Sequence, residues 1–204
     1  MTAMKLVAVS AGLGKPSSTR LLADRLSEAT RKQLGPDQQV EARVIELRDL
    51  ARDIANNMVT GFPSPALGEA IEAVTGADGV IAVTPIFTAS YSGLFKSFFD
   101  VIDHTALAGK PVLVGATGGT ARHSLALEHA LRPMFAYLRA VVAPTAVYAA
   151  SEDWGTGTGS QGDDLATRVA RAGGELAGLM RHGRTTGGVA EAVPFEERLA
   201  ALRL

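Results

Sequence analysis

The sequence predicts an α/β protein in which a parallel sheet is covered by helices on both faces, a three-layer sandwich. Five short apolar runs rich in β-branched residues alternate with amphipathic segments along the 204 residues. Such alternation favours parallel strands joined by helical crossovers, which bury both faces of the sheet. We expect a five-stranded sheet in the order 2-1-3-4-5. One domain is expected over residues 1–185, with a C-terminal tail over 186–204.

The first half of the chain alternates between these two kinds of segment. Strand candidates are apolar or alternate apolar with polar residues, whereas helix candidates repeat apolar residues every three or four positions. Glycine and proline mark the ends of the helices. The predicted elements are a strand at 6–9, a helix at 18–34, a strand at 40–47, an irregular segment at 49–65, a helix at 65–75 and a strand at 79–84.

The second half continues the same alternation and then becomes polar and rich in glycine. Its predicted elements are a helix at 92–103, a strand at 111–116, a long helix at 122–139, a strand at 141–147, a polar loop at 151–162 and a helix at 163–181. Trp154, in the glycine-rich loop, could be a lid aromatic, and an interface or packing residue is the alternative. The tail after Gly187 is weakly patterned, and a short helix could begin at Phe195.

Two of the predicted helices carry more apolar surface than one small sheet obviously needs. The residues concerned are Phe95, Phe98, Phe99, Leu127, Leu131 and Phe135. We therefore expect a homodimer or homotetramer built largely on these two helices.

Composition excludes several classes of function. The net charge of −1 provides no strong attraction for nucleic acid or for a membrane surface, and the absence of cysteine excludes disulfides and thiolate chemistry. No apolar run approaches the roughly 20 residues that span a bilayer, and no secretory signal is expected, so we predict a cytoplasmic protein. The four histidines lack the spacing of helical zinc ligands, and no nucleophile-elbow pattern occurs.

Three loops rich in glycine and hydroxyl residues follow the first, third and fourth predicted strands. They span residues 10–18, 85–92 and 117–122. In an open parallel sheet, ligands bind beyond the carboxyl ends of the strands, near the point where the strand order reverses. The three loops should therefore lie together and form one site.

The first loop leads into the first predicted helix and is suited to a phosphate. Unpaired N–H groups and the helix dipole favour an anion at such a helix start. The hydroxyls of Ser10, Ser17 and Thr19 could donate to phosphate oxygens, and Arg20 could add charge. The loop matches neither a Walker motif nor the dinucleotide fingerprint. A plain serine N-cap would also explain the pattern.

The other two loops could hold a planar ring such as a flavin. Backbone groups of residues 86–90 could meet the ring's heteroatoms, and Phe87 could flank it. Gly118 and Gly119 would let the backbone approach a ligand closely. An ordinary strand-to-helix turn with Ser92 as N-cap, and a tight glycine turn, are the alternatives.

Three motifs carry a family resemblance. They are Ser17-x-Thr19-x-x-Leu22-Ala23, Thr84-Pro85-x-x-x-Ala89-Ser90-Tyr91-Ser92-Gly93-x-x-Lys96 and Ala116-Thr117-Gly118-Gly119. Over roughly residues 4–150, the chain thereby resembles the flavodoxin-like NAD(P)H-dependent FMN reductases. It is most similar to the flavin reductase components of two-component sulfonate monooxygenases, and the Ser151–Trp154 segment resembles an actinobacterial-type subgroup.

The resemblance implies an NAD(P)H:FMN oxidoreductase that transfers hydride from nicotinamide to flavin N5 and supplies reduced FMN to a flavin-dependent monooxygenase. It places His129 where related reductases have an interface Tyr or His linked to a π-bulge; an ordinary polar interface residue is the alternative. The implied FMN-binding residues are Ser10, Ser17, Ser18, Thr19, Arg20, Pro85, Ile86, Phe87, Thr88, Ala89, Ser90, Thr117, Gly118, Gly119 and Thr120.

Besides a flavin-free structural domain, two other functions stay open at this point. One is a quinone- or azo-type reductase that keeps its FMN tightly bound. The other is a flavodoxin-like electron carrier, although such carriers are usually strongly acidic and this chain has a net charge of −1.

Overall fold

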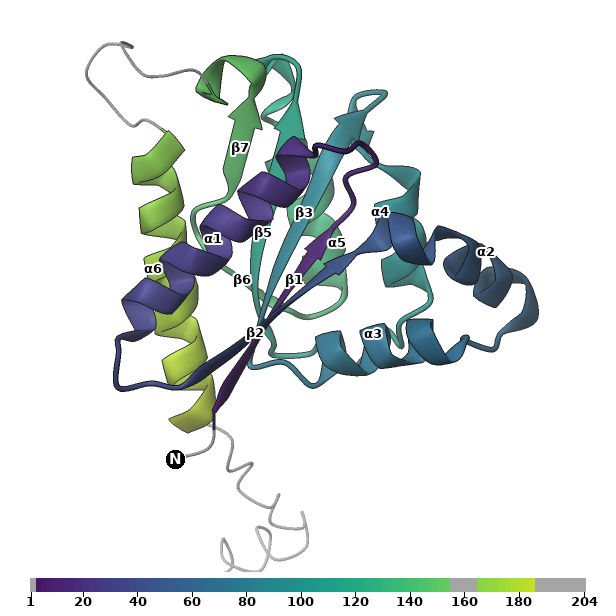
Figure 1. Ribbon diagram of the computed structural model, residues 1–204, viewed down its shortest axis with the longest axis horizontal. Coiled ribbons are helices and arrows are strands. Elements are labelled where there is room, and N and C mark those ends of the chain that lie inside the picture. The colour runs from purple at the N-terminus through teal and green to yellow at the C-terminus, as the bar shows by residue number, and fades with distance from the viewer. Residues whose placement is uncertain (1–2, 155–164, 186–204) are drawn as a thin grey trace, which may run out of the picture.

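A parallel sheet runs through the middle of the computed structural model (Figure 1), which describes residues 3–154 and 165–185. The sheet order is β2-β1-β3-β5, with β6 and β7 following one another along the far side of β5. The predicted order 2-1-3-4-5 is therefore confirmed. The strands of the first four positions are β2 (Val40–Glu46), β1 (Met4–Ser10), β3 (Gly79–Phe87) and β5 (Pro111–Gly118).

Helices cover both faces of this sheet, as expected (Figure 1). On one face, Leu22 and Leu26 of α1 pack with Leu176 of α6 against the strands. The opposite face buries apolar side chains of four further helices. The two layers comprise α1 (Ser18–Leu34) and α6 (Leu165–Thr185) on the first face, and α2 (Ala51–Thr60), α3 (Pro65–Thr75), α4 (Gly93–Asp100) and α5 (Arg132–Tyr137) on the second.

The fifth strand is interrupted, so the predicted continuous strand over 141–147 is wrong. It consists of β6 (Val141–Val142) and β7 (Val147–Ala150), which pair with opposite ends of β5. Between them, Pro144 has no N–H to donate to a ladder. The guanidinium of Arg132 donates to the carbonyls of Ala143 and Pro144, while Glu175 accepts from the N–H and hydroxyl of Thr145.

The segment predicted as irregular over 49–65 is mostly helical, which corrects the prediction. A short 3₁₀ turn, η1 (Leu47–Leu50), leads into α2. Only Ile54 and Asn57 of α2 are buried, so the apolar period is too sparse to recognise in the sequence. The helix ends at Gly61, whose φ of 77° is the left-handed conformation that glycine adopts readily.

The long helix predicted over 122–139 is broken into pieces. A 3₁₀ turn, η2 (Ala121–His123), is followed by a π-helical segment, η3 (Leu127–Leu131), and then by α5. His129 lies within the π-helical segment. Pro133, at the start of α5, lacks the N–H that a continuous α-helix would use.

The apolar residues that suggested an oligomer are used within the single chain. Four of them are fully buried, and Phe99 and Leu127 are nearly so; the four are Phe95, Phe98, Leu131 and Phe135. They form part of the core under α4 and α5. The argument for an interface made from these six side chains therefore fails, because their surface is already buried.

The remaining predictions concern the chain's last third. The segment after β7 begins with a 3₁₀ turn, η4 (Ser151–Trp154). The helix predicted over 163–181 corresponds to α6, which spans Leu165–Thr185. The rest of the predicted loop, the tail over 186–204 and the helix from Phe195 lie outside the described residues. Across residues 3–154 and 165–185, no helix is both long and apolar enough to cross a bilayer.

Candidate functional site

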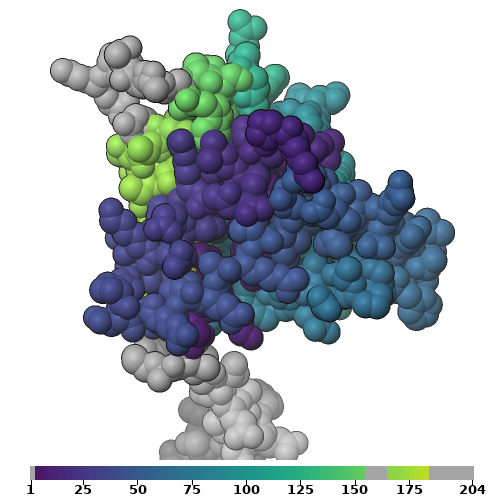
Figure 2. Space-filling view, viewed as in Figure 1, coloured from purple at the N-terminus to yellow at the C-terminus, as the bar shows by residue number. Residues whose placement is uncertain are grey.

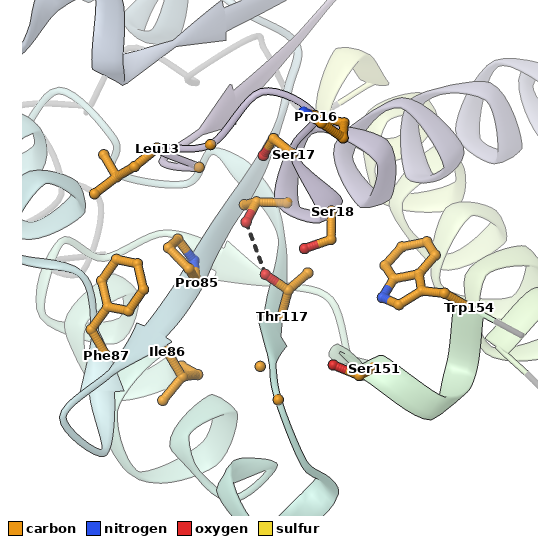
Figure 3. A pocket seen from close by; sticks show the side chains of 15 residues that line it. Leu13, Pro16, Ser17, Ser18, Pro85, Ile86, Phe87, Thr117, Ser151 and Trp154 are labelled. Carbon is orange, nitrogen blue, oxygen red and sulfur yellow. Dashed lines mark hydrogen bonds between the residues drawn. The ribbon is translucent and has the colours of Figure 1, made fainter.

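A pocket of about 540 Å³ opens at the carboxyl edge of the sheet (Figure 3). All three predicted loops line it, together with the turn after β7. These segments also meet on the molecular surface (Figure 2). The lining residues are Gly12, Leu13, Gly14, Pro16, Ser17, Ser18, Thr19, Pro85, Ile86, Phe87, Thr117, Gly118, Gly119, Ser151 and Trp154.

The start of α1 forms one wall of the pocket. The hydroxyl of Ser17 caps the helix by accepting from the N–H of Arg20 at 3.2 Å, and the carbonyl of Ser17 accepts from Leu21. The first-turn N–H groups of Ser18 and Thr19 have no carbonyl within the helix to bind. The serine N-cap that was the alternative to a phosphate site is thus present at Ser17, and two backbone donors remain beside the pocket.

A hydrogen bond ties the first loop to the third. The hydroxyls of Thr19 and Thr117 lie 2.8 Å apart, and both residues are almost fully buried (Figure 3). A buried hydroxyl without a partner would be unfavourable, so this bond stabilises the relative position of α1 and the end of β5. The pocket wall is therefore continuous between the two loops.

The second loop is a hairpin and not an open strand-to-helix turn. β3 extends to Phe87 and pairs with β4 (Ser90–Tyr91) in antiparallel fashion. Thr88 and Ala89 at its tip have φ values of 49° and 67°, the conformation of a type I′ turn, which costs more for a β-branched residue than for glycine. At the hairpin's base, the hydroxyl of Thr84 accepts from the N–H of Ser92 at 3.0 Å.

The third loop is held against β7 by Tyr148. The phenol of Tyr148 donates to the carbonyl of Thr120 at 2.8 Å. Burial, together with the nearby carboxylates of Glu152 and Asp153, raises the pKa of Tyr148, so the phenol keeps its proton at neutral pH. A Cβ on Gly118 would lie 2.0 Å from this phenol oxygen, and only glycine fits there without displacing the ring.

Ser151 and Trp154 complete the pocket, and sequence reasoning placed neither among the site residues. They follow β7, whose end at Ala150 was predicted at Val147. Had the strand been extended by three residues, Ser151 would have stood at the same carboxyl edge as the other loops. Trp154, the sole tryptophan of the chain, was considered only as a lid aromatic or a packing residue.

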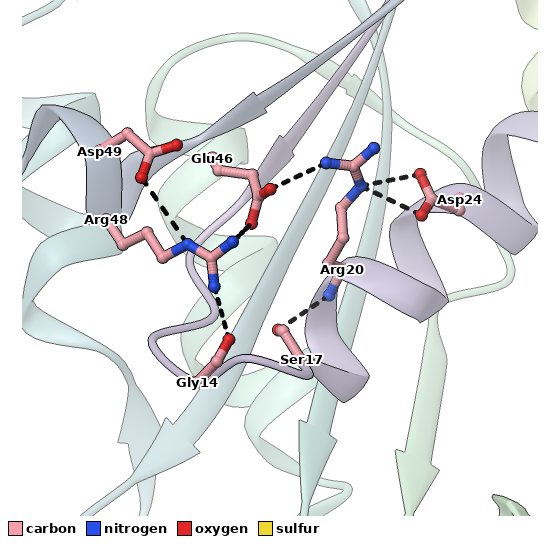
Figure 4. A network of polar contacts seen from close by, with 7 residues as sticks. All are labelled: Gly14, Ser17, Arg20, Asp24, Glu46, Arg48 and Asp49. Carbon is pink, nitrogen blue, oxygen red and sulfur yellow. Dashed lines mark hydrogen bonds and ion pairs between the residues drawn. The ribbon is translucent and has the colours of Figure 1, made fainter.

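A group of charged side chains lies beside the pocket and not in it (Figure 4). We call Arg20, Asp24, Glu46, Arg48 and Asp49 the ionic cluster. Glu46 accepts from Arg20 at 2.9 Å and pairs with Arg48 at 2.6 Å. Arg20 also donates to both oxygens of Asp24, a contact that raises the pKa of Arg20.

The structure brings nine of the fifteen predicted FMN-binding residues to the pocket. Arg20 instead turns to the carboxylates of the ionic cluster. Ser10 is completely buried, and within the described residues its hydroxyl has no hydrogen-bond partner. The four others lie next to the lining segments, at the hairpin tip and beyond the glycine pair: Thr88, Ala89, Ser90 and Thr120.

The chemistry of the pocket is that of a binding site without a charged acid or base. None of its lining residues has an ionisable carboxylate, amine or guanidinium. It offers hydroxyls, backbone groups at glycine and the apolar faces of Leu13, Phe87 and Trp154. Such a surface suits a ligand with a flat ring system and an end that accepts hydrogen bonds.

Known proteins that are similar in sequence to this chain are described as FMN reductases. The sequence model of a family described as NADPH-dependent FMN reductase matches residues 4–155. An FMN reductase (NADPH) of Pseudomonas aeruginosa is 39% identical over 150 residues, which cover 74% of this chain and 78% of that protein. The NADH-dependent FMN reductase SfnF of Pseudomonas fluorescens is 38% identical over 151 residues, covering 74% and 79%.

Solved structures agree with these sequence relatives. An oxidoreductase from Corynebacterium diphtheriae superposes with a TM-score of 0.84 at 45% identity, covering 89% of this chain and 99% of that one. The apo form of the NADH:FMN oxidoreductase EmoB superposes with a TM-score of 0.68 at 29% identity, covering 90% and 89%.

Proposed function

The chain belongs to the NADPH-dependent FMN reductase family, and we propose that its pocket binds FMN for reduction by NAD(P)H. FMN supplies the chemistry when bound, since its N5 accepts a hydride from the nicotinamide. The observation that carries the proposal is the match over residues 4–155, which includes every residue that lines the pocket.

The residues of the first loop fit the phosphate end of FMN. Free first-turn N–H groups at Ser18 and Thr19 and the dipole of α1 favour an anion there. Gly12 keeps this corner open, since a Cβ at that position would lie 2.0 Å from the Ser17 hydroxyl. The buried, unpartnered hydroxyl of Ser10 lies at the end of β1, beneath the same loop, and is a further donor for this corner.

The other walls fit the ring. Pro85, Ile86 and Phe87 form one side, and Gly118 and Gly119 leave the backbone of the third loop accessible. Holding a nicotinamide against a flavin removes an entropic barrier and requires no acid or base from the protein. An uncharged pocket is therefore sufficient for hydride transfer, because the chain has only to bind, orient and exclude water.

We also propose where the reduced FMN goes and how the chain assembles. The resemblance to reductase components supports a flavin-dependent monooxygenase as the recipient, in the cytoplasm. A homodimer or homotetramer is supported by Leu125 and Tyr137, which are 64% and 75% exposed on either side of the π-helical segment. These two side chains replace the buried set as the candidate contact.

Steady-state oxidation of NADH and of NADPH, each with and without added FMN, tests the function. We expect oxidation to depend on added FMN and to saturate with it. If FMN instead co-purifies and further FMN does not raise the rate, the quinone- or azo-type reductase gains support. Bound flavin that stays oxidised after anaerobic addition of both nucleotides would favour an electron carrier.

A further inference from the structure

We propose that the indole N–H of Trp154 is an additional ligand of the anionic end of bound FMN, an inference that rests on the proposed function. Trp154 lines the pocket with Ser18 and Ser151. Figure 3 shows the nitrogen edge of the indole turned toward Ser18 and the pocket interior. No group in residues 3–154 or 165–185 accepts a hydrogen bond from this nitrogen.

Contacts from two helices hold the indole in this position. Asp153 accepts from the N–H of Ala150 at 2.7 Å and from Arg168 of α6 at 2.8 Å, which fixes the turn that carries Trp154. The guanidinium of Arg25, on α1, lies 5.0 Å from the centre of the indole ring. One face of the ring is thus engaged by a cation, and the edge that bears the N–H is left for the pocket.

The charge distribution around the pocket makes a neutral donor important. A phosphate at the start of α1 has no lysine or arginine among the lining residues. Arg20 is engaged by Asp24 and Glu46, and Arg48 is engaged by Glu46 and by the carbonyl of Gly14. Among the residues that line the pocket, the remaining donors are therefore hydroxyls, backbone N–H groups and the indole N–H.

The indole nitrogen can only donate a hydrogen bond, so its partner on FMN must be an acceptor, either a ring carbonyl or a phosphate oxygen. Its neighbours across the pocket are Ser18 and the first turn of α1, the corner assigned to the phosphate. Hydrogen bonds to an ionised acceptor are about twice as strong as neutral ones. The geometry therefore favours a donor that distinguishes FMN from riboflavin, which lacks the phosphate.

The test compares FMN with riboflavin in Trp154→Phe, which keeps an aromatic ring for Arg25 and removes the N–H donor; the smaller ring affects both ligands alike, whereas loss of the donor affects FMN alone. We expect the FMN dissociation constant to rise about tenfold or more, as for loss of a hydrogen bond to a charged group. The riboflavin constant should stay within about twofold. Isothermal titration measures both, and Phe62→Leu is the control, because Phe62 is an exposed aromatic just after α2 and does not line the pocket.

A second measurement needs no variant. The chain has one tryptophan, so its indole N–H gives a single NMR resonance. FMN should shift this resonance downfield, and riboflavin should shift it much less. Equal weakening of both ligands by Trp154→Phe, or equal shifts with both, would overturn the proposal in favour of plain ring packing. In contrast, a wild-type chain that neither binds nor reduces FMN would refute the proposed function itself.

Discussion

Two neighbouring regions at the carboxyl end of the sheet use opposite chemistry. The pocket has no charged side chain among its lining residues (Figure 3), whereas the ionic cluster places three carboxylates and two guanidiniums side by side (Figure 4). Both guanidiniums of the ionic cluster, those of Arg20 and Arg48, are paired with carboxylates of the protein. The comparison indicates that ion pairs hold the first loop in position, whereas the proposed ligand would meet uncharged groups.

Gly14 connects the two regions. Its carbonyl accepts from Arg48 at 2.5 Å, while Gly14 itself lines the pocket. The Gly14 carbonyl accepts from Nη1 of Arg48, and Glu46 pairs with the other terminal nitrogen, Nη2. The ionic cluster can therefore influence ligand binding without touching the ligand, because it determines where the first loop lies.

The largest effect is expected inside the pocket, at Gly118. In Gly118→Ala the new Cβ would lie 2.0 Å from the phenol oxygen of Tyr148, so the ring must move and release the carbonyl of Thr120. Overpacking of this kind destabilises a protein by about 1–3 kcal/mol. We expect the melting temperature to fall by several degrees, at about 2–4 °C per kcal/mol, and FMN affinity to fall at least tenfold, or about 1.4 kcal/mol.

Gly119→Ala is the matched control for stability. A Cβ at that position meets nothing within 4 Å, so the melting temperature of this variant should equal that of the wild type. Combining Gly118→Ala with Tyr148→Phe removes the closest contact and should recover part of the stability. If Gly118→Ala binds FMN as well as the wild type, the third loop does not form a wall of the flavin site.

A smaller effect is expected in the ionic cluster. Glu46→Gln removes the charge that pairs with Arg20 and Arg48, both of which are only partly exposed. Allowing for solvent screening, we expect a loss of about 1–2 kcal/mol in urea unfolding. FMN affinity should fall by about threefold to tenfold, a difference of about 0.6–1.4 kcal/mol, because Arg48 no longer holds Gly14 firmly. Tighter FMN binding would instead show that a released Arg20 reaches the phosphate, and the contrast between the two regions would break down.

The pocket shows what could and could not be predicted from the sequence. Strand order and the meeting of three loops follow from apolar periodicity and the rules of parallel sheets, and the structure confirms the order. Ser151 and Trp154 were not predicted as FMN-binding residues, because the fifth strand was taken to end at Val147, three residues before β7 ends. The full set of partners of Arg20 could not be read from the sequence, since Glu46 lies 26 residues away on β2, whereas Asp24 is on the same helix.

The smallest effect on FMN binding is expected at Arg20, where the resemblance implies a phosphate ligand and the structure shows ion pairs. In Arg20→Met the apolar stem is kept and the charge is lost, so Asp24 and Glu46 lose a partner. Exposed pairs contribute about 0.2–1 kcal/mol, and we expect a stability loss in that range. The FMN dissociation constant should change by less than about threefold, or about 0.6 kcal/mol. Arg31→Met, which breaks an exposed pair with Glu28 on the same helix, is the control. A tenfold weakening confined to Arg20→Met, and absent with riboflavin, would show that the guanidinium leaves the ionic cluster to bind the phosphate.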